Sequence, residues 1–388
     1  MTTEFDLPRD LMEKEILPRV PITSLRAVRS TCKDREASSK NQILGKAAGA
    51  TKQLLGFMMI DYKVCSLKFD LHDAMRDNEE LVIIINQENL VDHVEISQII
   101  HCDGLLLCVI KDNKGLVVWN PYLGQIKCIQ PREKFDSFDV YALGYDNNRN
   151  HKILRIIFDH YYRVLGYEIY DFSFGSWKDV VYVTHDWDIW FHQPGASLKG
   201  NTYFFVQERG TKDLNTYAQD KRKKNLEEYL LCFDFTTEKF GPRLPLPHDK
   251  DNVSLSCVGD EELAVLCQTW GTSHVIEIWV TDKIDPNAVS WRNYLELLDS
   301  GIQVDIYGGS FFIDEENKAA VIFDIGEPEP NQTCRYRTVR IITQDGLFAS
   351  GNMGEAPNFG TPHESGYVDE KYCFPLVCSS YVPSLVQL

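Results

Sequence analysis

The chain has 388 residues, of which 44% are hydrophobic and 25% charged, a composition that suits a globular protein with a substantial buried core. Its formal net charge is −17, with 40 basic and 57 acidic residues, which argues against bulk nucleic-acid binding because neutralising phosphates requires a basic face. The 18 tyrosines, 20 phenylalanines and 7 tryptophans favour β structure, because aromatic rings pack well on pleated, half-buried surfaces.

Three short helices are predicted within residues 1–54. Residues 11–17 form an amphipathic run that ends at a proline, and residues 25–32 follow the Thr23-Ser24 pair, which supplies good N-caps. A third helix is predicted over 43–47. Because three such helices bury too little surface to be stable alone, we expect a partner or the rest of the chain to stabilise them.

After residue 55 the pattern changes to β structure. Short apolar runs recur between turn residues, with almost no helical period between them, which predicts an all-β sandwich, barrel or propeller. The runs are 81–85, 105–110, 116–119, 153–158, 202–206, 229–235, 263–267, 275–280, 310–313, 319–323 and 338–342.

A degenerate repeat favours a propeller among these architectures. One line of the repeat is a strand that ends in an aromatic residue, a polar residue and a turn, with the aromatic residue at Trp119, Tyr170, Phe233 and Trp279. The spacings are close to the ~40–50 residues of a propeller blade. The second line is a polar turn followed by an apolar strand, at 101–107, 198–204, 259–265 and 311–321. Together they predict four-stranded units that must stack, about six to eight of them over residues 55–388.

Two segments are candidates for recognition within this β region. The polar stretch 211–228 has no apolar period and is predicted to be an inserted surface loop, where recognition residues are often found. Trp187, Trp190 and Phe191 are the candidates for substrate contact, although an equally simple interpretation is that they pack between blades. The neighbouring histidines and aspartates at 185, 186, 188 and 192 match no standard zinc spacing.

No other chemistry is predicted. The sequence contains no Gly-x-Ser-x-Gly, no phosphate-binding loop and no His-Glu-x-x-His, so we predict no catalytic residue, no metal and no cofactor. The eleven cysteines are an odd number without a Cys-x-x-Cys pair, and Cys108 and Cys232 lie inside apolar runs, where Cys acts as a small core residue.

The location expected from these features is intracellular. Residues 1–6 lack the basic start and apolar segment of a signal peptide, and no apolar run approaches the ~20 residues that span a bilayer. The basic run 221–224 is either a nuclear-import signal or a solvated loop. We expect a reduced protein of the nucleus, the cytoplasm or both.

Three N-terminal stretches form a recognisable pattern: Leu7-Pro8-Arg9-Asp10-Leu11, Ile16-Leu17-Pro18-Arg19-Val20-Pro21, and the residues from Ser24 to Lys33. This pattern resembles an F-box. The stretches 102–108, 117–124, 141–146, 167–177, 233–247 and the tail 378–385 are similar to the plant F-box-associated, kelch-like domain. The resemblance implies two domains, an F-box over 1–54 and a propeller-like domain over 55–388, and an α+β chain overall.

The resemblance also implies a division of labour. The F-box would dock on the adaptor of an SCF-type, cullin–RING ubiquitin ligase, and the β domain would bind the target protein, without an active site and without nucleic-acid or membrane partners. The adaptor-binding positions that it implies are Leu7, Pro8, Leu11, Ile16, Leu17, Val20, Pro21, Leu25, Val28 and Cys32.

Two departures from the F-box pattern predict weaker adaptor binding. The segment 9–15 is one residue longer than usual, so either Met12 takes the place of Leu11 on the helix face of Ile16 or the Leu-Pro start is displaced. Arg35 stands where the family has Trp, and losing a buried Trp typically costs ~3 kcal/mol or more. Two other interpretations therefore stay open: a stand-alone propeller interaction module, and a propeller that binds glycans or is an enzyme.

Overall fold

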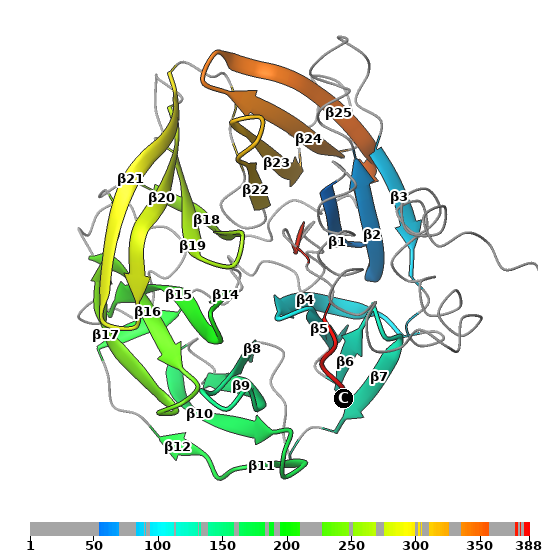
Figure 1. Ribbon diagram of the computed structural model, residues 1–388, viewed down its shortest axis with the longest axis vertical. Helices are drawn as coiled ribbons and strands as arrows, with labels where there is room; N and C mark the ends of the chain where they lie inside the picture. Colours follow the sequence, from blue (N-terminus) through cyan, green and yellow to red (C-terminus); the bar gives the residue numbers. More distant parts are fainter. Residues whose placement is uncertain are drawn as a thin grey trace, which may run out of the picture.

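The computed structural model is a ring of β-sheets around a central axis (Figure 1). The structure describes residues 54–69, 83–88, 90, 94–111, 114–130, 132, 139–158, 163–182, 186–189, 195–209, 227–247, 251–268, 275–298, 302, 304, 310–325, 335–356, 377–378, 381 and 384–388. Within these ranges there are six antiparallel sheets, so the predicted propeller is confirmed, with six blades. Each apolar run predicted as a strand overlaps a strand, although residues 81–82 lie outside the described ranges.

The blades follow the chain around the ring, and the strands of each blade run in order from the innermost to the outermost. Blade 1 contains β26 (Val377–Cys378), β1 (Leu54–Ile60), β2 (Lys63–Phe69) and β3 (Ile83–Gln87), and blade 2 contains β4 (Ile96–Cys102), β5 (Leu105–Ile110), β6 (Leu116–Asn120) and β7 (Gln125–Ile129). Blade 3 contains β8 (Val140–Tyr145), β9 (His151–Phe158), β10 (Val164–Asp171) and β11 (Ser176–Trp177), with β12 (Val181–Tyr182) also paired to β10.

The second half of the ring has the same design. Blade 4 contains β13 (Trp187–Ile189) and β14 (Ala196–Leu198), both paired to β15 (Asn201–Glu208), then β16 (Glu228–Asp234) and β17 (Lys239–Pro245). Blade 5 contains β18 (Asp251–Val258), β19 (Glu262–Gln268), β20 (Ile276–Asp285) and β21 (Ala288–Leu297). Blade 6 contains β22 (Ser310–Asp314), β23 (Ala319–Ile325), β24 (Arg335–Thr343) and β25 (Gly346–Ala356).

The core consists of apolar clusters between neighbouring blades. In β23, Ile322 packs toward blade 5 and Phe323 packs toward blade 1, because successive side chains of a strand point to opposite faces. A middle strand is therefore buried on both faces and reads as a continuous apolar run. Cys108 and Cys232 are buried in such clusters, as the sequence predicted.

The two ends of the ring carry different connections. At one end, which we call the A–B face, hairpin turns join the first strand of a blade to the second and the third to the fourth. The opposite end, which we call the B–C face, carries the second-to-third connections and the links between blades. The predicted polar turns lie on the A–B face: Asp103-Gly104 joins β4 to β5 and Lys199-Gly200 joins β14 to β15. All four residues have positive φ, as tight two-residue hairpins require.

One line of the predicted repeat is displaced. The strand that contains Trp279 does not end there, because β20 continues to Asp285 before the chain turns at residues 286–287. The long β20–β21 hairpin contains two register shifts. Because of these shifts, the spacing of residues in the sequence does not predict where the turn lies. Asp285 accepts a hydrogen bond from the Asn287 N–H at 2.9 Å and so caps the turn as Asp171 and Asp234 cap theirs.

A strand from the C-terminal part of the chain closes the ring. In β26, Val377 and Cys378 pair with Met58 and Phe57 of β1, and β26 lies beside β1 near the centre of the ring (Figure 1). The buried Tyr381 then packs edge-on against the Phe57 ring, with the ring centroids 5.0 Å apart. The first and last parts of the propeller are thus joined within one blade.

The helical predictions for residues 1–54 and the domain boundary at 54/55 stay predictions, because the described residues begin at Leu54. A membrane-spanning helix is not found in the described part of the chain, where none is both long and apolar enough. Leu54 begins β1, the second strand of blade 1. The preceding residues therefore join the propeller at its A–B face.

Candidate interaction site

The predicted contact residues are only partly within the described ranges. The adaptor-binding positions between Leu7 and Cys32 lie outside them, as do Trp190 and Phe191. Trp187 lies in β13 with 8% of its surface exposed, and its ring is 5.0 Å from that of Phe240 in the cluster between blades 3 and 4. Its packing role is thus visible, while substrate contact by these aromatic residues stays a prediction.

The innermost strand of blade 4 is broken beside this aromatic cluster. Both β13 and β14 pair with β15, at Trp187↔Glu208 and Ala196↔Tyr203 respectively. Residues 190–195 lie between the two pieces in the sequence where β15 has only residues 204–205, so the two pieces pair with β15 in different registers. The predicted insertion, 211–228, lies outside the described residues as far as 226; the strands on either side, β15 and β16, pair directly at Gln207↔Glu228, at the B–C face.

The acidic residues of this cluster are paired with arginines. Asp188 accepts two hydrogen bonds from Arg209, at 2.6 and 3.1 Å. Asp186 accepts one from Arg243 at 2.7 Å, and the Arg243 guanidinium stacks on the Tyr229 ring at 4.6 Å. Among the described residues no group of three or more His, Cys, Asp or Glu is arranged to hold a metal ion. Ion pairing accounts for these two carboxylates.

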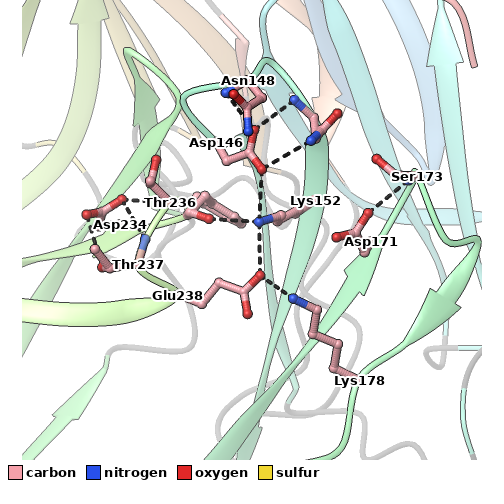
Figure 2. A network of polar contacts seen from close by, with 12 residues as sticks. Asp146, Asn148, Lys152, Asp171, Ser173, Lys178, Asp234, Thr236, Thr237 and Glu238 are labelled. Atoms are coloured by element: carbon pink, nitrogen blue, oxygen red, sulfur yellow. Dashed lines mark hydrogen bonds and ion pairs between the residues drawn. The ribbon is translucent and has the colours of Figure 1, made fainter.

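A buried lysine joins blades 3 and 4 on the A–B face (Figure 2). The ammonium of Lys152 in β9 is 2.9 Å from Glu238 Oε1, 3.2 Å from Asp146 Oδ2 and 3.1 Å from the Phe235 carbonyl oxygen. Glu238 also pairs with Lys178. The network links the first hairpin of blade 3 to the outer hairpin of blade 4, so it fixes the angle between the two blades.

The network depends on pH in a defined direction. Burial alone would raise the pKa of both Asp146 and Glu238, but hydrogen bonds from Asn150 and Lys152 to Asp146, and from Lys178 and Lys152 to Glu238, lower it below the ordinary value. A carboxylate with a lowered pKa stabilises the fold above its unfolded pKa, about 3.9 for Asp and 4.3 for Glu, and the contribution is lost as pH falls through the folded pKa.

The Lys152 end of the network titrates in the alkaline range. Burial alone would lower the pKa of Lys152, but Glu238 and Asp146 raise it above the ordinary value. A lysine with a raised pKa stabilises the fold fully below its unfolded pKa of about 10.4, and the contribution is lost as pH rises through the folded pKa. The junction is therefore fully charged between about pH 5 and 9.

Replacing Glu238 by glutamine is expected to lower the free energy of unfolding by about 1–3 kcal/mol at pH 7, because the buried Lys152 loses a charged partner. The difference from the wild type should shrink as the pH falls below the unfolded pKa of about 4.3, because the unfolded chain then binds a proton that the folded carboxylate, with its lowered pKa, binds only at lower pH. Urea unfolding at pH 7 and pH 3.5 measures both values. The control is Glu261→Gln, whose ion pair with Lys199 is exposed and should contribute almost nothing; equal losses in the two variants would contradict the junction's role.

A second buried charge group lies between blades 2 and 3. Arg155 in β9 donates to Asp139 Oδ2 at 2.6 and 2.8 Å and to Glu168 Oε1 at 2.6 Å. Sequence analysis missed Lys152 and Arg155, although Lys152 directly precedes the apolar run 153–158 and Arg155 interrupts it. A cation inside an apolar run signals a buried ion pair. The Lys152 network links blades 3 and 4, whereas the printed partners of Arg155 lie within blade 3.

Comparison with known proteins assigns the family. The model of the F-box associated beta propeller domain matches residues 55–388. An F-box/kelch-repeat protein of Arabidopsis thaliana is 56% identical over 398 aligned residues, which cover 100% of this chain and 97% of the relative. An F-box protein of the same plant is 47% identical, with 100% of both chains covered.

This chain belongs to the plant F-box proteins with an F-box-associated β-propeller. The resemblance read from the sequence is thereby confirmed, and the names of these relatives indicate no catalytic activity. Among solved structures, a luciferin-regenerating enzyme gives a TM-score of 0.40 at 8% identity, with 73% of this chain and 90% of that chain covered. A score this low supports no further comparison.

Proposed function

We propose that this F-box protein is a non-catalytic substrate receptor of an SCF-type ubiquitin ligase. The observation that carries the proposal is that relatives named as F-box proteins align with 100% of the chain, including the segment that carries the F-box pattern. In this role the F-box binds the ligase adaptor and, through it, a cullin, while the propeller binds a target protein.

The fold supports a separation of the two tasks. The chain from the F-box joins the propeller at the A–B face, where β1 begins. The opposite, B–C face carries the start of β13 at Trp187 and the inserted connection between β15 and β16. We propose the B–C face as the target-binding surface, because a target bound there leaves the adaptor side of the ring unobstructed.

Binding of the full-length protein to the purified adaptor tests the proposal. We expect the wild type to bind, Leu17→Asp to weaken binding about tenfold or more by placing a charge in an apolar interface, and Arg35→Trp to strengthen it by restoring a large apolar anchor. Isothermal calorimetry or a quantitative pull-down gives the affinities. Tyr182→Ser is the matched control, because Tyr182 is 79% exposed on the outer edge of blade 3 and its loss should leave adaptor binding unchanged.

The outcomes separate the open interpretations. Failure of the wild type to bind, with binding gained by Arg35→Trp, would overturn the receptor role in favour of a stand-alone propeller module. Failure of both would overturn it as well and would identify the longer spacing before Ile16 as the further defect.

A further inference from the structure

Three carboxylates surround one guanidinium at the B–C end of blade 4. Arg243 donates a hydrogen bond to Asp186 at 2.7 Å. The same guanidinium lies 3.7 Å from Glu208 Oε1 and 3.6 Å from Glu227 Oε2, distances that allow ion pairing but exceed the usual length of a hydrogen bond. Among the described residues of this group, which we call the acidic cluster, one positive charge thus faces three negative charges.

The strands of blade 4 hold the acidic cluster at the surface. Asp186 directly precedes β13, and Glu208 ends β15. Glu227 directly precedes β16, and Arg243 reaches the other three from the outermost strand, β17. The side chains of Asp186 and Glu227 are both 70% exposed, and that of Glu208 is 41% exposed. The carboxylates are therefore accessible to a partner.

A buried hydroxyl group without a hydrogen-bond partner lies beneath the acidic cluster. Tyr229 of β16 is 2% exposed, and the Arg243 guanidinium stacks on its ring, 4.6 Å from the centroid. Its Oη atom has no hydrogen-bond partner in the part of the chain that the structure describes. Burial raises the pKa of Tyr229 to about 12, and the three carboxylates of the cluster add to the rise while Arg243 opposes it. The hydroxyl group thus lies in the field of all four charged groups.

A second cation is the ligand that this arrangement favours. Like charges held this close repel each other, and Glu208 and Glu227 keep acceptor oxygens to which Arg243 donates no hydrogen bond. A lysine or arginine side chain carries the charge and the donors that such oxygens accept. The formal net charge of −17 also attracts a basic segment over a longer range.

We propose that the acidic cluster binds a lysine or arginine side chain of the target protein. The cation pairs with Glu208 and Glu227, and the Arg243 side chain, which is 38% exposed, turns aside so that Tyr229 Oη accepts a hydrogen bond. The proposal rests on the proposed function, because the cluster lies on the B–C face that we assign to the target. It adds the chemistry of the segment that this face selects, which is basic.

The test uses the full-length protein without the adaptor and two fluorescein-labelled peptides of glycine and serine. One peptide carries two arginines and the other carries two glutamates. We expect saturable binding of the arginine peptide at low salt, measured by fluorescence anisotropy, and binding about tenfold or more weaker for the glutamate peptide. Added salt should weaken the binding of the arginine peptide, because exposed charges are screened.

Matched variants assign the binding to the acidic cluster. Glu208→Gln combined with Glu227→Gln should weaken binding of the arginine peptide about tenfold or more. Glu315→Gln combined with Glu316→Gln removes the same charge from exposed positions in the β22–β23 turn on the A–B face and should leave the affinity unchanged. Should the first double variant unfold at lower urea than the wild type, Glu227→Gln alone replaces it, since that side chain is 70% exposed.

Tyr229→Phe tests the hydroxyl group separately, because it keeps the ring beneath Arg243. It should weaken binding of the arginine peptide about threefold or more. The midpoint of urea unfolding should stay the same or rise, since the variant removes a buried polar group that has no partner. A purely structural role of Tyr229 would lower the midpoint and leave the affinity unchanged.

Three results would each overturn the proposal: equal affinity for the two peptides, equal losses in the two double variants, or unchanged affinity in Tyr229→Phe. A loss of affinity confined to the variants of the acidic cluster would establish it. Glu208→Gln combined with Glu227→Gln should bind the adaptor as the wild type does, so a failure of the cluster is distinguished from a failure of the ligase role.

Discussion

Replacing Arg155 by methionine is expected to lower the free energy of unfolding by about 3–5 kcal/mol, the usual cost of breaking a buried ion pair by removing one partner. The side chains of its partners, Asp139 and Glu168, are 0% and 1% exposed. Without the guanidinium, two neighbouring carboxylates stay buried and lose the cation that both of them contact. Urea unfolding at pH 7, followed by tryptophan fluorescence, measures the loss.

The control for Arg155 is an arginine with the same partner chemistry on the surface. Arg132 pairs with Asp179 at 3.1 Å, with the two side chains 45% and 97% exposed, so Arg132→Met should change the free energy of unfolding by about 0–1 kcal/mol. Adding Asp139→Asn and Glu168→Gln to Arg155→Met should recover part of the loss, because the unpaired charges are then removed. A triple variant less stable than Arg155→Met alone would contradict this explanation.

Most of the middle strands in blades 2 to 6 were predictable because they are buried on both faces. Strands such as β5 and β23 therefore read as unbroken apolar runs, which a local scan detects. The outermost strands, such as β21 and β25, face solvent on much of their surface. Their mixed composition resembles that of loops, and sequence analysis passed over them for this reason.

The features that position the interaction sites depend on contacts between residues far apart in the sequence. The pairing of β26 with β1 closes the ring. β26 has only two residues, and their sequence does not indicate which strand they pair with. The break between β13 and β14 is equally invisible, because it is defined only by the pairing of both pieces with β15.

Asn120 is a position where the sequence held a usable signal. The repeat line that contains Trp119, Tyr170 and Phe233 continues with Asn120, Asp171 and Asp234. A single asparagine in a position otherwise held by aspartate indicates that an amide donor is needed there. The sequence alone does not reveal that the acceptors are carbonyl oxygens of Ser384 and Val386, since these lie at the other end of the chain.

Tyr381→Ala is expected to lower the free energy of unfolding by about 3–5 kcal/mol, the usual cost of truncating a fully buried aromatic residue. The ring packs on Phe57 at 5.0 Å and on His101 at 5.6 Å, so it fastens the segment that follows β26 to blades 1 and 2. Its loss leaves a cavity at the point where the ring closes. Thermal and urea unfolding measure the loss, and hydrogen exchange in β1 should accelerate.

Tyr381→Phe removes the hydroxyl group but keeps the ring contacts with Phe57 and His101. It therefore separates the contribution of ring packing from that of the hydroxyl group. It should cost only about 0–1 kcal/mol, and hydrogen exchange in β1 should stay slow. Equal losses for alanine and phenylalanine, or an alanine variant in which exchange in β1 is unchanged, would show that the ring does not hold the closure. Since every blade is stabilised by its two neighbours, a failure at this one junction should spread to the strands of blade 1 before those of blade 4.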